Sequence, residues 1–297
     1  MASSRASTEP GAALPWGSRT YVMGVINLTP DSFSDGGRFD RPAAALAQAR
    51  AMLAQGADLL DLGGQSTRPG AAVISAEQEL QRLLPALELI RTACAESSCV
   101  NSADALPGGP LLSIDTFRAP VAAAALAAGA HWINDVSGGR RDPEILAVVA
   151  EHGCPYVLMH SRGDSGSMDG LAHYSDVVAE VRQELLRATD NALAAGVRTD
   201  QLIWDPGLGF AKTTEHNLAL LRGLAELRRD GFPLLVGPSR KRFIGAVLDE
   251  PRPRARLWGT AAVCAQAITQ GADVLRVHDV GPIAQTARML DAIVRPS

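Results

Sequence analysis

Carboxylates follow short apolar runs at two places where a buried strand would end. The run LLSID ends in Asp115, and the run QLIWD ends in Asp205. A carboxylate at the edge of an apolar core loses hydration unless neighbouring groups compensate its charge. We therefore expect these two side chains to line a polar cavity rather than to lie within packed hydrocarbon.

Basic residues follow two later apolar runs. The segment GPSRKRFIG places Ser239, Arg240 and Lys241 before an expected helix, and RVHDV carries Arg276 and His278 two residues apart. Side chains two apart on a strand point the same way. Cations and free backbone amides at a helix N-terminus suit a phosphate group. DPGLGFAKT is not a P-loop, because an alanine stands where that motif requires a glycine before its lysine.

The elements that must position these residues alternate regularly. Expected strands cover 21–26, 58–62, 111–115, 131–136, 155–159, 201–205, 233–237 and 273–277. Expected helices cover 42–55, 75–93, 118–128, 142–152, 174–195, 215–229, 253–270 and 282–294. Eight such units, with strands apolar on both faces, predict an α/β fold, a single-domain (β/α)8 TIM barrel. A doubly wound open sheet is the alternative, but it needs fewer strands or a second domain, and no linker is evident.

Three glycine-alanine pairs support this register. Gly56, Gly129 and Gly271 each follow a helical segment and lead into a strand, where a left-handed residue commonly ends the helix. Residues 1–19 are rich in Ala, Ser, Pro and Gly and are expected to form a flexible tail, with the barrel over 20–297. The irregular insert 97–110 precedes a strand and is expected on the barrel face away from the chemistry.

The active site of such a barrel lies where the strands end. Every expected strand end carries a polar side chain: Asn27, Asp61, Asp115, Asn134 with Asp135, His160, Asp205, Ser239 with Lys241, and Arg276 with His278. A single one of these is better explained as a cap or a loop hydrogen bond, and His160 and Asp61 are open to that interpretation. Together they indicate one pocket. The loops 27–39 and 63–71 are long enough to close over a ligand.

Composition excludes several classes of protein. A net charge of −4 without a basic cluster argues against nucleic-acid binding, and the apolar stretches are too short to span a membrane. The N-terminal residues lack the apolar region of a secretory signal. Four cysteines without a completing Cys or His pair predict reduced thiols in a reducing compartment, so a cytoplasmic location is expected.

Seven motifs resemble those of the dihydropteroate synthase family, in the family's order. They are NLTPDSFSDGG, GGQSTRPG, SIDT, INDVSGG, DPGLGF, GPSRK and RVHD, and the resemblance covers about residues 20–294. It implies a (β/α)8 barrel that is usually a homodimer. It also implies a monofunctional transferase that joins p-aminobenzoate to 6-hydroxymethyl-7,8-dihydropterin pyrophosphate, giving 7,8-dihydropteroate and pyrophosphate in folate biosynthesis.

The resemblance also implies roles for individual residues. The pterin would be bound by Asp115, Asn134, Met159, Asp205, Phe210, Lys241 and Arg276. The pyrophosphate would be bound by Asn27, Arg68, Arg276 and His278, with Asn27 as a ligand of Mg2+. The p-aminobenzoate would lie against Phe33, Thr67, Pro69 and Ser239. Asp115, Lys241 and Arg68 would be the catalytic residues.

The implied mechanism is dissociative. Loss of Mg-pyrophosphate leaves a cationic methylene, which the reduced pterin and Asp115 stabilise, and the amine then attacks. No Ser/His/Asp triad is evident to supply a strong base. The chain departs from the family pattern at Gln65, where many bacterial members have Glu, at Pro238, and over HSRGD (160–164).

Three other functions fit parts of the pattern. A pterin-binding methyltransferase shares the carboxylates that bind the pterin edge, but it has no use for the STRP and SRK loops. A generic phosphate-binding barrel is a second alternative. The third is a pterin-binding or regulatory protein without turnover, which would not need Asn27, Arg68, Lys241, Arg276 and His278 for a leaving group.

Overall fold

The structure is a computed structural model, and it describes residues 14–29, 41–66, 73–96, 106, 109–164 and 166–295. Its strands are β1 (Tyr21–Asn27), β2 (Leu59–Gly63), β3 (Leu111–Asp115), β4 (Trp132–Asp135), β5 (Tyr156–Met159), β6 (Leu202–Asp205), β7 (Leu235–Val236) and β8 (Val274–Val277). They form one parallel sheet in the order β6-β5-β4-β3-β2-β1-β8-β7. A parallel bridge from Trp204 to Leu234 joins β6 to the segment leading into β7, so the sheet closes. The expected TIM barrel is confirmed.

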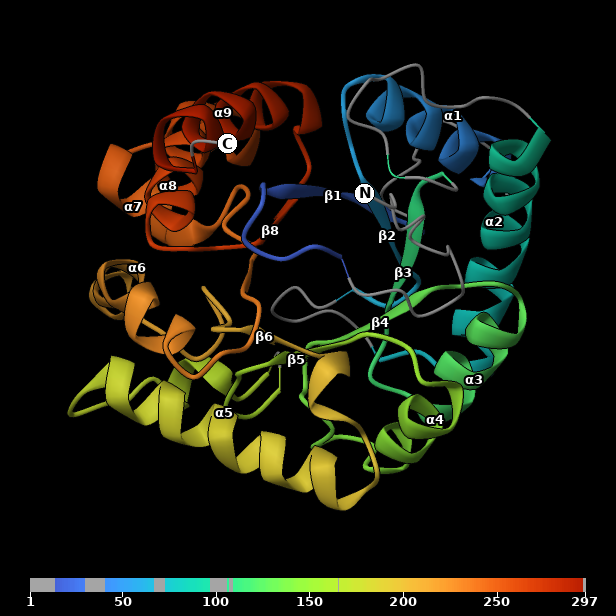
Figure 1. The fold of residues 1–297 in the computed structure, drawn as a ribbon, viewed down its shortest axis with the longest axis horizontal. Coiled ribbons are helices and arrows are strands. Elements are labelled where there is room, and N and C mark those ends of the chain that lie inside the picture. The colour runs from blue at the N-terminus through green and yellow to red at the C-terminus, as the bar shows by residue number, and fades with distance from the viewer. Residues whose placement is uncertain are drawn as a thin grey trace, which may run out of the picture.

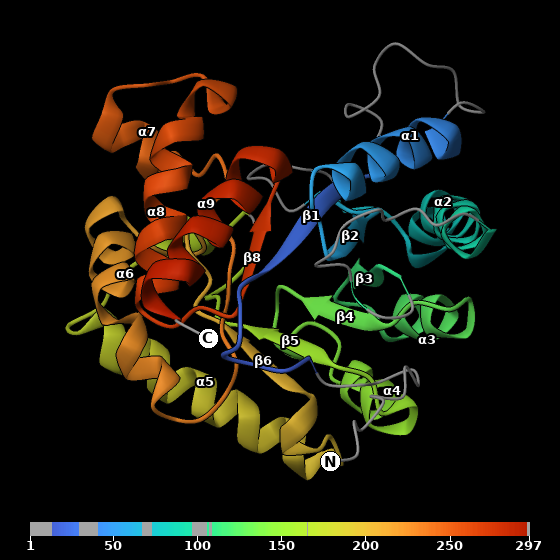
Figure 2. The same cartoon turned by 45° about the horizontal axis from the view of Figure 1, so that its top comes forward.

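Helices surround the strands in chain order (Figure 1). They are α1 (Arg41–Ala54), α2 (Ala76–Glu96), α3 (Ala119–Ala127), α4 (Glu144–His152), α5 (Val177–Ala194), α6 (Thr214–Arg228), α7 (Arg242–Leu248), α8 (Leu257–Thr269) and α9 (Val280–Val294). Helix α7 begins where the sequence indicated a helix start after Lys241, and among the described residues it is a helix additional to the eight expected segments. Figure 2 shows α7 standing beyond the end of α8. The first residues of the expected helix 253–270 form a short 3-10 turn, Pro253–Arg256.

The glycine pairs do what the sequence predicts. Gly56, Gly129 and Gly271 have φ angles of 99°, 96° and 93°. These lie in the left-handed region that a side chain disfavours. Each glycine therefore ends a helix and turns the chain into the next strand.

The two faces of each strand serve different cores. Outward side chains such as Leu112 and Ile114 of β3 pack in the large apolar core that the strands share with the helices. Inward side chains fill the lower end of the barrel with a separate apolar cluster. That lower cluster contains Leu14, Tyr21, Met23, Leu59, Trp132, Val157, Ile203, Leu235 and Val274, with Trp16, Leu106 and Leu111 packed against it. All eight strands contribute to it, counting Leu111 of β3.

Residues before the first strand help to close this lower end. Leu14 is buried in the lower cluster, and the Trp16 ring lies 6.0 Å from Tyr21 and 6.1 Å from Trp132 between centroids. The tail was expected over 1–19. Residues 1–13 lie outside the described residues, whereas Leu14 and Trp16 are packed because their apolar side chains fill the open bottom of the barrel. Leu106 of the insert 97–110 packs at this end too, on the face where the insert was expected.

Polarity changes two residues further along the strands. Moving two residues beyond Leu59, Trp132, Ile203 and Val274 of the lower cluster reaches Asp61, Asn134, Asp205 and Arg276. Because the side-chain period of a strand is two, these polar residues also point inward. The upper barrel interior is therefore polar.

None of the described helices is both long and apolar enough to cross a membrane. Cys154 and Cys264 carry free thiols. Burial raises the pKa of Cys154 and of Cys264 to about 12, so both are held as neutral thiols.

Candidate active site

Asp61 of β2 is the centre of the polar upper interior. It is fully buried and accepts three hydrogen bonds, one each from Ser113 Oγ at 2.6 Å, Asn134 Nδ2 at 3.0 Å and Arg276 Nε at 2.6 Å. The four residues come from β2, β3, β4 and β8. These donors compensate the charge that a buried carboxylate could not otherwise keep. Asp61 was open to interpretation as a loop-orienting residue, and it instead holds two of the predicted pterin residues in place.

Arg276 bridges Asp61 and Asp115. Its Nη2 donates to Asp115 Oδ2 at 2.7 Å, and the two carboxylates share one guanidinium. Burial raises the pKa of Asp115 to about 7; Arg276 opposes that shift and Asp61 adds to it. Asp115 is thus poised to change charge near neutral pH. Within the described residues Arg276 Nη1 makes no hydrogen bond, so its N–H groups are available to a ligand.

Asp205 ends β6 and interacts electrostatically with Arg276 and Lys241 in the same polar interior. Its Oδ1 accepts from the backbone N–H of Gly207 at 2.7 Å. Burial raises its pKa, although Gly207, Lys241 and Arg276 act in the other direction. Met159 of β5 lies opposite Asp205 in the sheet register. A carboxylate held by a backbone amide keeps lone pairs free, so Asp205 can accept a pair of N–H donors.

Lys241 immediately precedes α7 and interacts electrostatically with Asp205 and Asp115. Its Nζ lies 4.3 Å from the centroid of the Phe210 ring, a distance typical of a cation–π contact. Burial lowers the pKa of Lys241 to about 8, partly offset by the charge of Asp205. The two predicted pterin residues Lys241 and Phe210 therefore lie together, although they come from different loops.

Ser239, after β7, and His278, after β8, form a hydrogen-bonded pair. Ser239 Oγ accepts from the backbone N–H of His278 at 3.1 Å and lies 3.0 Å from its Nδ1. Burial, together with the charges of Arg240 and Arg276, lowers the pKa of His278 to about 3. A neutral imidazole that accepts from the serine at Nδ1 presents its Nε2–H as a donor. Arg240 is committed elsewhere, because it forms a two-bond ion pair with Asp279.

Asn27 ends β1 opposite Gly63 of β2 and is partly buried at the upper rim. The remaining predicted site residues, Phe33, Thr67, Arg68 and Pro69, lie outside the described residues.

Two strand-end residues do not join the pocket, which corrects the expectation that all eight ends converge there. Asp135 accepts from the backbone of Ser137 and Gly139 and from Tyr156 Oη, and so fixes the loop after β4. His160 faces Lys212 and Glu184 behind the loop after β6. For both residues the interpretation as a loop hydrogen bond is the one that holds.

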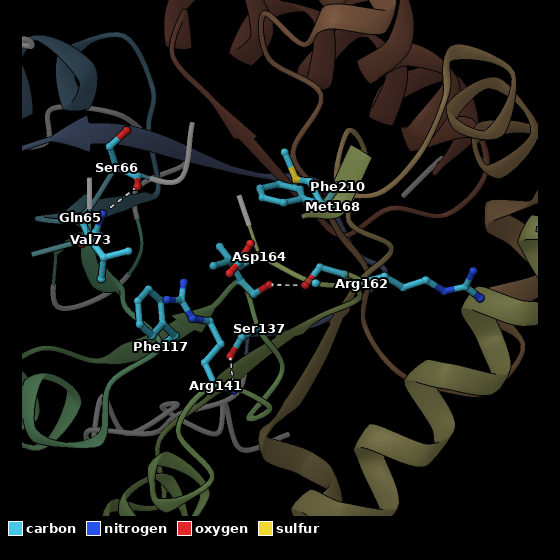
Figure 3. A pocket seen from close by; sticks show the side chains of 13 residues that line it. Gln65, Ser66, Val73, Phe117, Ser137, Arg141, Arg162, Asp164, Met168 and Phe210 are labelled. Atoms are coloured by element: carbon cyan, nitrogen blue, oxygen red, sulfur yellow. Dashed lines mark hydrogen bonds between the residues drawn. The ribbon is translucent and has the colours of Figure 1, made fainter. Parts of the chain in front are cut away.

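A neighbouring cavity was not found from the sequence (Figure 3). Phe210 is the predicted site residue that lines it, among the residues the structure describes. Its lining comprises Gln65, Ser66, Val73, Phe117, Val136, Ser137, Arg141, Ser161, Arg162, Gly163, Asp164, Met168 and Phe210. The Arg141 guanidinium lies 3.7 Å from the Phe117 ring centroid. The paired arginines of SGGRRD and the family departure at HSRGD are the sequence features that could have drawn attention to these loops.

Gln65 departs from the common family residue and holds both ends of the second loop. Its Nε2 donates to the Ser66 carbonyl at 2.9 Å, and its Oε1 accepts from the Ile74 backbone at 3.0 Å. A glutamate could accept from Ile74, but an ionised one could not donate to a carbonyl. The glutamine therefore joins the two described ends of the segment that contains Thr67, Arg68 and Pro69.

Metal ligands are sparse in this site. Over the described ranges, no group of three or more His, Cys, Asp or Glu side chains is arranged to hold a metal ion. Asn27 offers one amide oxygen at the rim. Magnesium commonly takes one or two protein ligands and completes its shell with substrate phosphates and water. This donor set fits an ion that arrives with a phosphorylated substrate.

Comparisons with known proteins agree on a single family. The family model for pterin binding enzymes matches residues 23–278. A dihydropteroate synthase of Synechocystis is 51% identical over 280 residues, which cover 94% of this chain and 92% of that protein.

Solved structures give the same result. The dihydropteroate synthase of Clostridium difficile, crystallised in the presence of pteroic acid, superposes with a TM-score of 0.85 at 37% identity and covers 95% of this chain and 99% of that chain. The Xanthomonas albilineans enzyme with 4-aminobenzoic acid has a TM-score of 0.82 at 41% identity, with 93% of each chain covered. The family resemblance of the seven motifs is confirmed, and the chain belongs to the pterin binding enzymes, among the dihydropteroate synthases.

Proposed function

We propose that this protein condenses 6-hydroxymethyl-7,8-dihydropterin pyrophosphate with p-aminobenzoate, giving 7,8-dihydropteroate and pyrophosphate. One observation carries the proposal: Asp61, Asp115, Asn134 and Arg276, from four different strands, form one hydrogen-bonded group at the upper end of the barrel. Asp205 and Lys241 interact electrostatically with members of that group. The arrangement suits a flat heterocycle with N–H donors on one edge and an anionic tail.

The pterin is held edge-on by acceptors and donors from different strands. Asp205 accepts from the N3–H and the 2-amino group, because Gly207 has already fixed its carboxylate. Asn134 donates to Asp61 through Nδ2 and so presents its carbonyl oxygen to the ligand. Asp115 binds the rest of that edge, and Lys241 donates to the pterin carbonyl. Met159, Phe210 and Arg276 contact the ring faces.

The leaving group and the amine lie toward the rim. Arg276, the Nε2–H of His278 and Arg68 bind the pyrophosphate. Ser239, with Phe33, Thr67 and Pro69 of the long loops, forms the p-aminobenzoate pocket. The Ser239–His278 hydrogen bonds link the two subsites, so the amine is held beside the departing pyrophosphate.

In this proposal a Mg2+ ion would be bound together with the pyrophosphate and would supply the charge that neutralises the leaving oxygens. Asn27 holds it through the amide oxygen.

The chain's own charges account for the chemistry. Asp115, when ionised, stabilises positive charge that develops on the pterin methylene as the C–O bond to pyrophosphate breaks. Lys241 fixes the carbonyl edge so that the methylene lies near that carboxylate. Arg68 and Arg276 stabilise the departing anion. Each well-placed contact contributes about 3 kcal/mol in a transition state of this kind. The aryl amine then attacks and loses its proton.

A homodimer completes the proposal. Val247 and Leu248 at the end of α7 are 57% and 50% exposed, and Trp258 at the start of α8 is 78% exposed. A second copy of this chain would cover these apolar side chains, and Trp258→Glu should then give a monomer in light scattering. We also propose a single barrel domain and a cytoplasmic location; the free thiols of Cys154 and Cys264 support the location.

The test is direct. The purified protein is mixed with the pterin pyrophosphate and Mg2+, and pyrophosphate release is followed with and without p-aminobenzoate. The proposal expects amine-dependent release that matches dihydropteroate formation in amount. Pterin binding without release would instead identify a binding protein. Release that ignores the amine would identify a hydrolase.

A further inference from the structure

The loop after β6 is strained and lies between two functional residues. It begins at Asp205, which faces the pterin site, and it carries Phe210, which lies against Lys241. Gly207, Gly209 and Ala211 all have positive φ, at 66°, 77° and 48°. The left-handed region costs an alanine roughly 1 kcal/mol, so this turn needs support from outside itself.

Lys212 supplies that support from the side away from the pocket. Its Nζ donates to the Gly207 carbonyl at 3.1 Å, to the Phe210 carbonyl at 3.0 Å and to His160 Nδ1 at 2.9 Å. Burial lowers the pKa of Lys212 to about 7, partly offset by the charges of Asp205 and Glu184. In its ammonium form the side chain has three N–H donors, and here all three are used. Lys212 therefore has no donor left for a substrate, and each of its bonds fixes the loop or its neighbour.

The link from Lys212 to the pterin carboxylate runs through one residue. The carbonyl of Gly207 accepts from Lys212, while its N–H donates to Asp205 Oδ1. A Cβ at Gly207 would lie 1.8 Å from the His160 carbonyl oxygen, so the turn has little room to move. The Gly207 carbonyl and N–H belong to adjacent peptide units that meet at the Gly207 Cα, so a shift of this residue would displace the N–H that orients Asp205.

His160 fixes the direction of the ammonium. Nδ1 must be unprotonated to accept from Lys212, which places the ring proton on Nε2, where it donates to Glu184 Oε2 at 2.9 Å. Burial and the charge of Lys212 lower the pKa of His160 to about 4. Arg162 pairs with Glu184 and with Glu180 of α5. The backbone N–H of His160 donates to the Asp205 carbonyl at 2.9 Å, so both ends of the loop are held from β5.

The choice of residue is informative. The chain has 28 basic Lys and Arg residues, and only Lys212 and Lys241 among them are lysines. An ammonium directs three donors toward three separate acceptors, whereas the planar guanidinium of arginine cannot converge on the same points. Both lysines meet the same loop, Lys241 at the Phe210 ring and Lys212 behind the Phe210 carbonyl.

We infer that Lys212, held by His160, is a positioning residue for the condensation: it touches neither substrate and fixes the loop that orients Asp205 and Phe210 toward the pterin. The inference rests on the proposed function. Because Ser239 and the second loop make no contact with Lys212 in the described part of the chain, its effect falls on the pterin and not on p-aminobenzoate.

The first test compares Lys212→Met with Lys212→Arg. Both should weaken binding of the pterin and raise its KM at least about tenfold, with kcat lowered up to about 100-fold, because small misplacements of substrate cost this much. The KM for p-aminobenzoate should change less than about threefold. Arg182→Met removes an exposed cation of α5 from its ion pair with Asp230; it is the matched control and should behave like the wild type.

The second test separates the role of His160 from general packing. In His160→Asn the amide oxygen lies near the position of Nδ1 and can still accept from Lys212, whereas His160→Gln reaches toward Glu184 instead. The inference expects the asparagine variant to retain more pterin affinity than the glutamine variant when both have the same melting temperature.

The outcomes distinguish the two proposals. If the wild type releases no amine-dependent pyrophosphate, the proposed function fails whatever the variants do. If the wild type is active, the inference is overturned by normal pterin constants in Lys212→Met. It is equally overturned if both KM values rise together with a falling melting temperature, since that describes a structural residue only.

Discussion

The two ends of the barrel interior are built from the same strands and differ in every physical respect. The lower end is filled by apolar side chains such as Trp132, Ile203 and Val274. Two residues further on, Asn134, Asp205 and Arg276 make the interior polar. Removal of the apolar side chains at the lower end from water stabilises the fold. The buried charges at the upper end cost stability unless hydrogen bonds and opposite charges compensate them. Residues that stabilise the fold and residues that form the candidate site are therefore only two positions apart on the same strand.

Asp205→Ala at the upper end should have the largest effect of the substitutions considered. It removes the acceptor for the pterin N–H groups, so affinity for a non-reactive 6-hydroxymethylpterin should fall at least about 1,000-fold, or about 4 kcal/mol. Calorimetry measures this directly. Asp200→Ala, at a position 68% exposed, is the control and should bind normally. Unchanged affinity in Asp205→Ala would remove that carboxylate from the site.

Trp132→Ala should show the opposite behaviour. Loss of a fully buried indole at the lower end should cost about 3–5 kcal/mol of unfolding free energy, measured by urea denaturation. At a temperature where the variant stays folded, its KM for the pterin should change less than about twofold. Asn134→Ala, two residues along the same strand, should lose pterin affinity instead. If the two variants behaved alike, the division of the interior would be wrong.

Asp61→Asn should affect both properties, because Asp61 lies where the two regions meet. The substitution leaves Arg276 with Asp115 as its carboxylate partner. It also places an amide N–H where Asp61 accepts hydrogen bonds, so two donors would face each other. We expect a loss of about 1–3 kcal/mol in stability and about tenfold in kcat/KM. Asp58→Asn is the matched control on the lower side, where Asp58 accepts from the Val22 backbone. It should lose stability alone, and a kinetic defect there would contradict the assignment.

The pH profile should give the smallest effect, about tenfold per pH unit. Asp115 must be ionised and its pKa is raised to about 7, so kcat/KM should rise with pH through that value. Lys241 must be charged and its pKa is lowered to about 8, so kcat/KM should fall above it, and loss of the Lys212 proton, whose pKa is lowered to about 7, adds to that fall. In Lys241→Arg the alkaline limb should move to higher pH while the acid limb stays. A profile that is flat from pH 6 to 9 would contradict both assignments.

Asp61 and His160 show how far the sequence could be used. Both follow apolar runs and both had the same two interpretations. Strands that are apolar on both faces give no alternation from which to decide whether a polar residue points inward. Asp61 faces inward and organises the site, whereas His160 lies behind the loop after β6. The residue types at the strand ends indicated a polar site, but the sequence did not show which of these side chains point into the barrel.

The sequence by itself determined the eight strand–helix units, the turns at Gly56, Gly129 and Gly271, and the polar residues at the strand ends. These follow from local periodicity and from backbone conformations that favour glycine. The tertiary structure alone decided which ends meet. Arg276 pairs with Asp61, 215 residues away in the sequence. The sheet places β8 and β2 on either side of β1, so inward side chains of both strands meet inside the barrel. Lys212 became significant for the same reason, since its three acceptors come together only after β5 and β6 have paired.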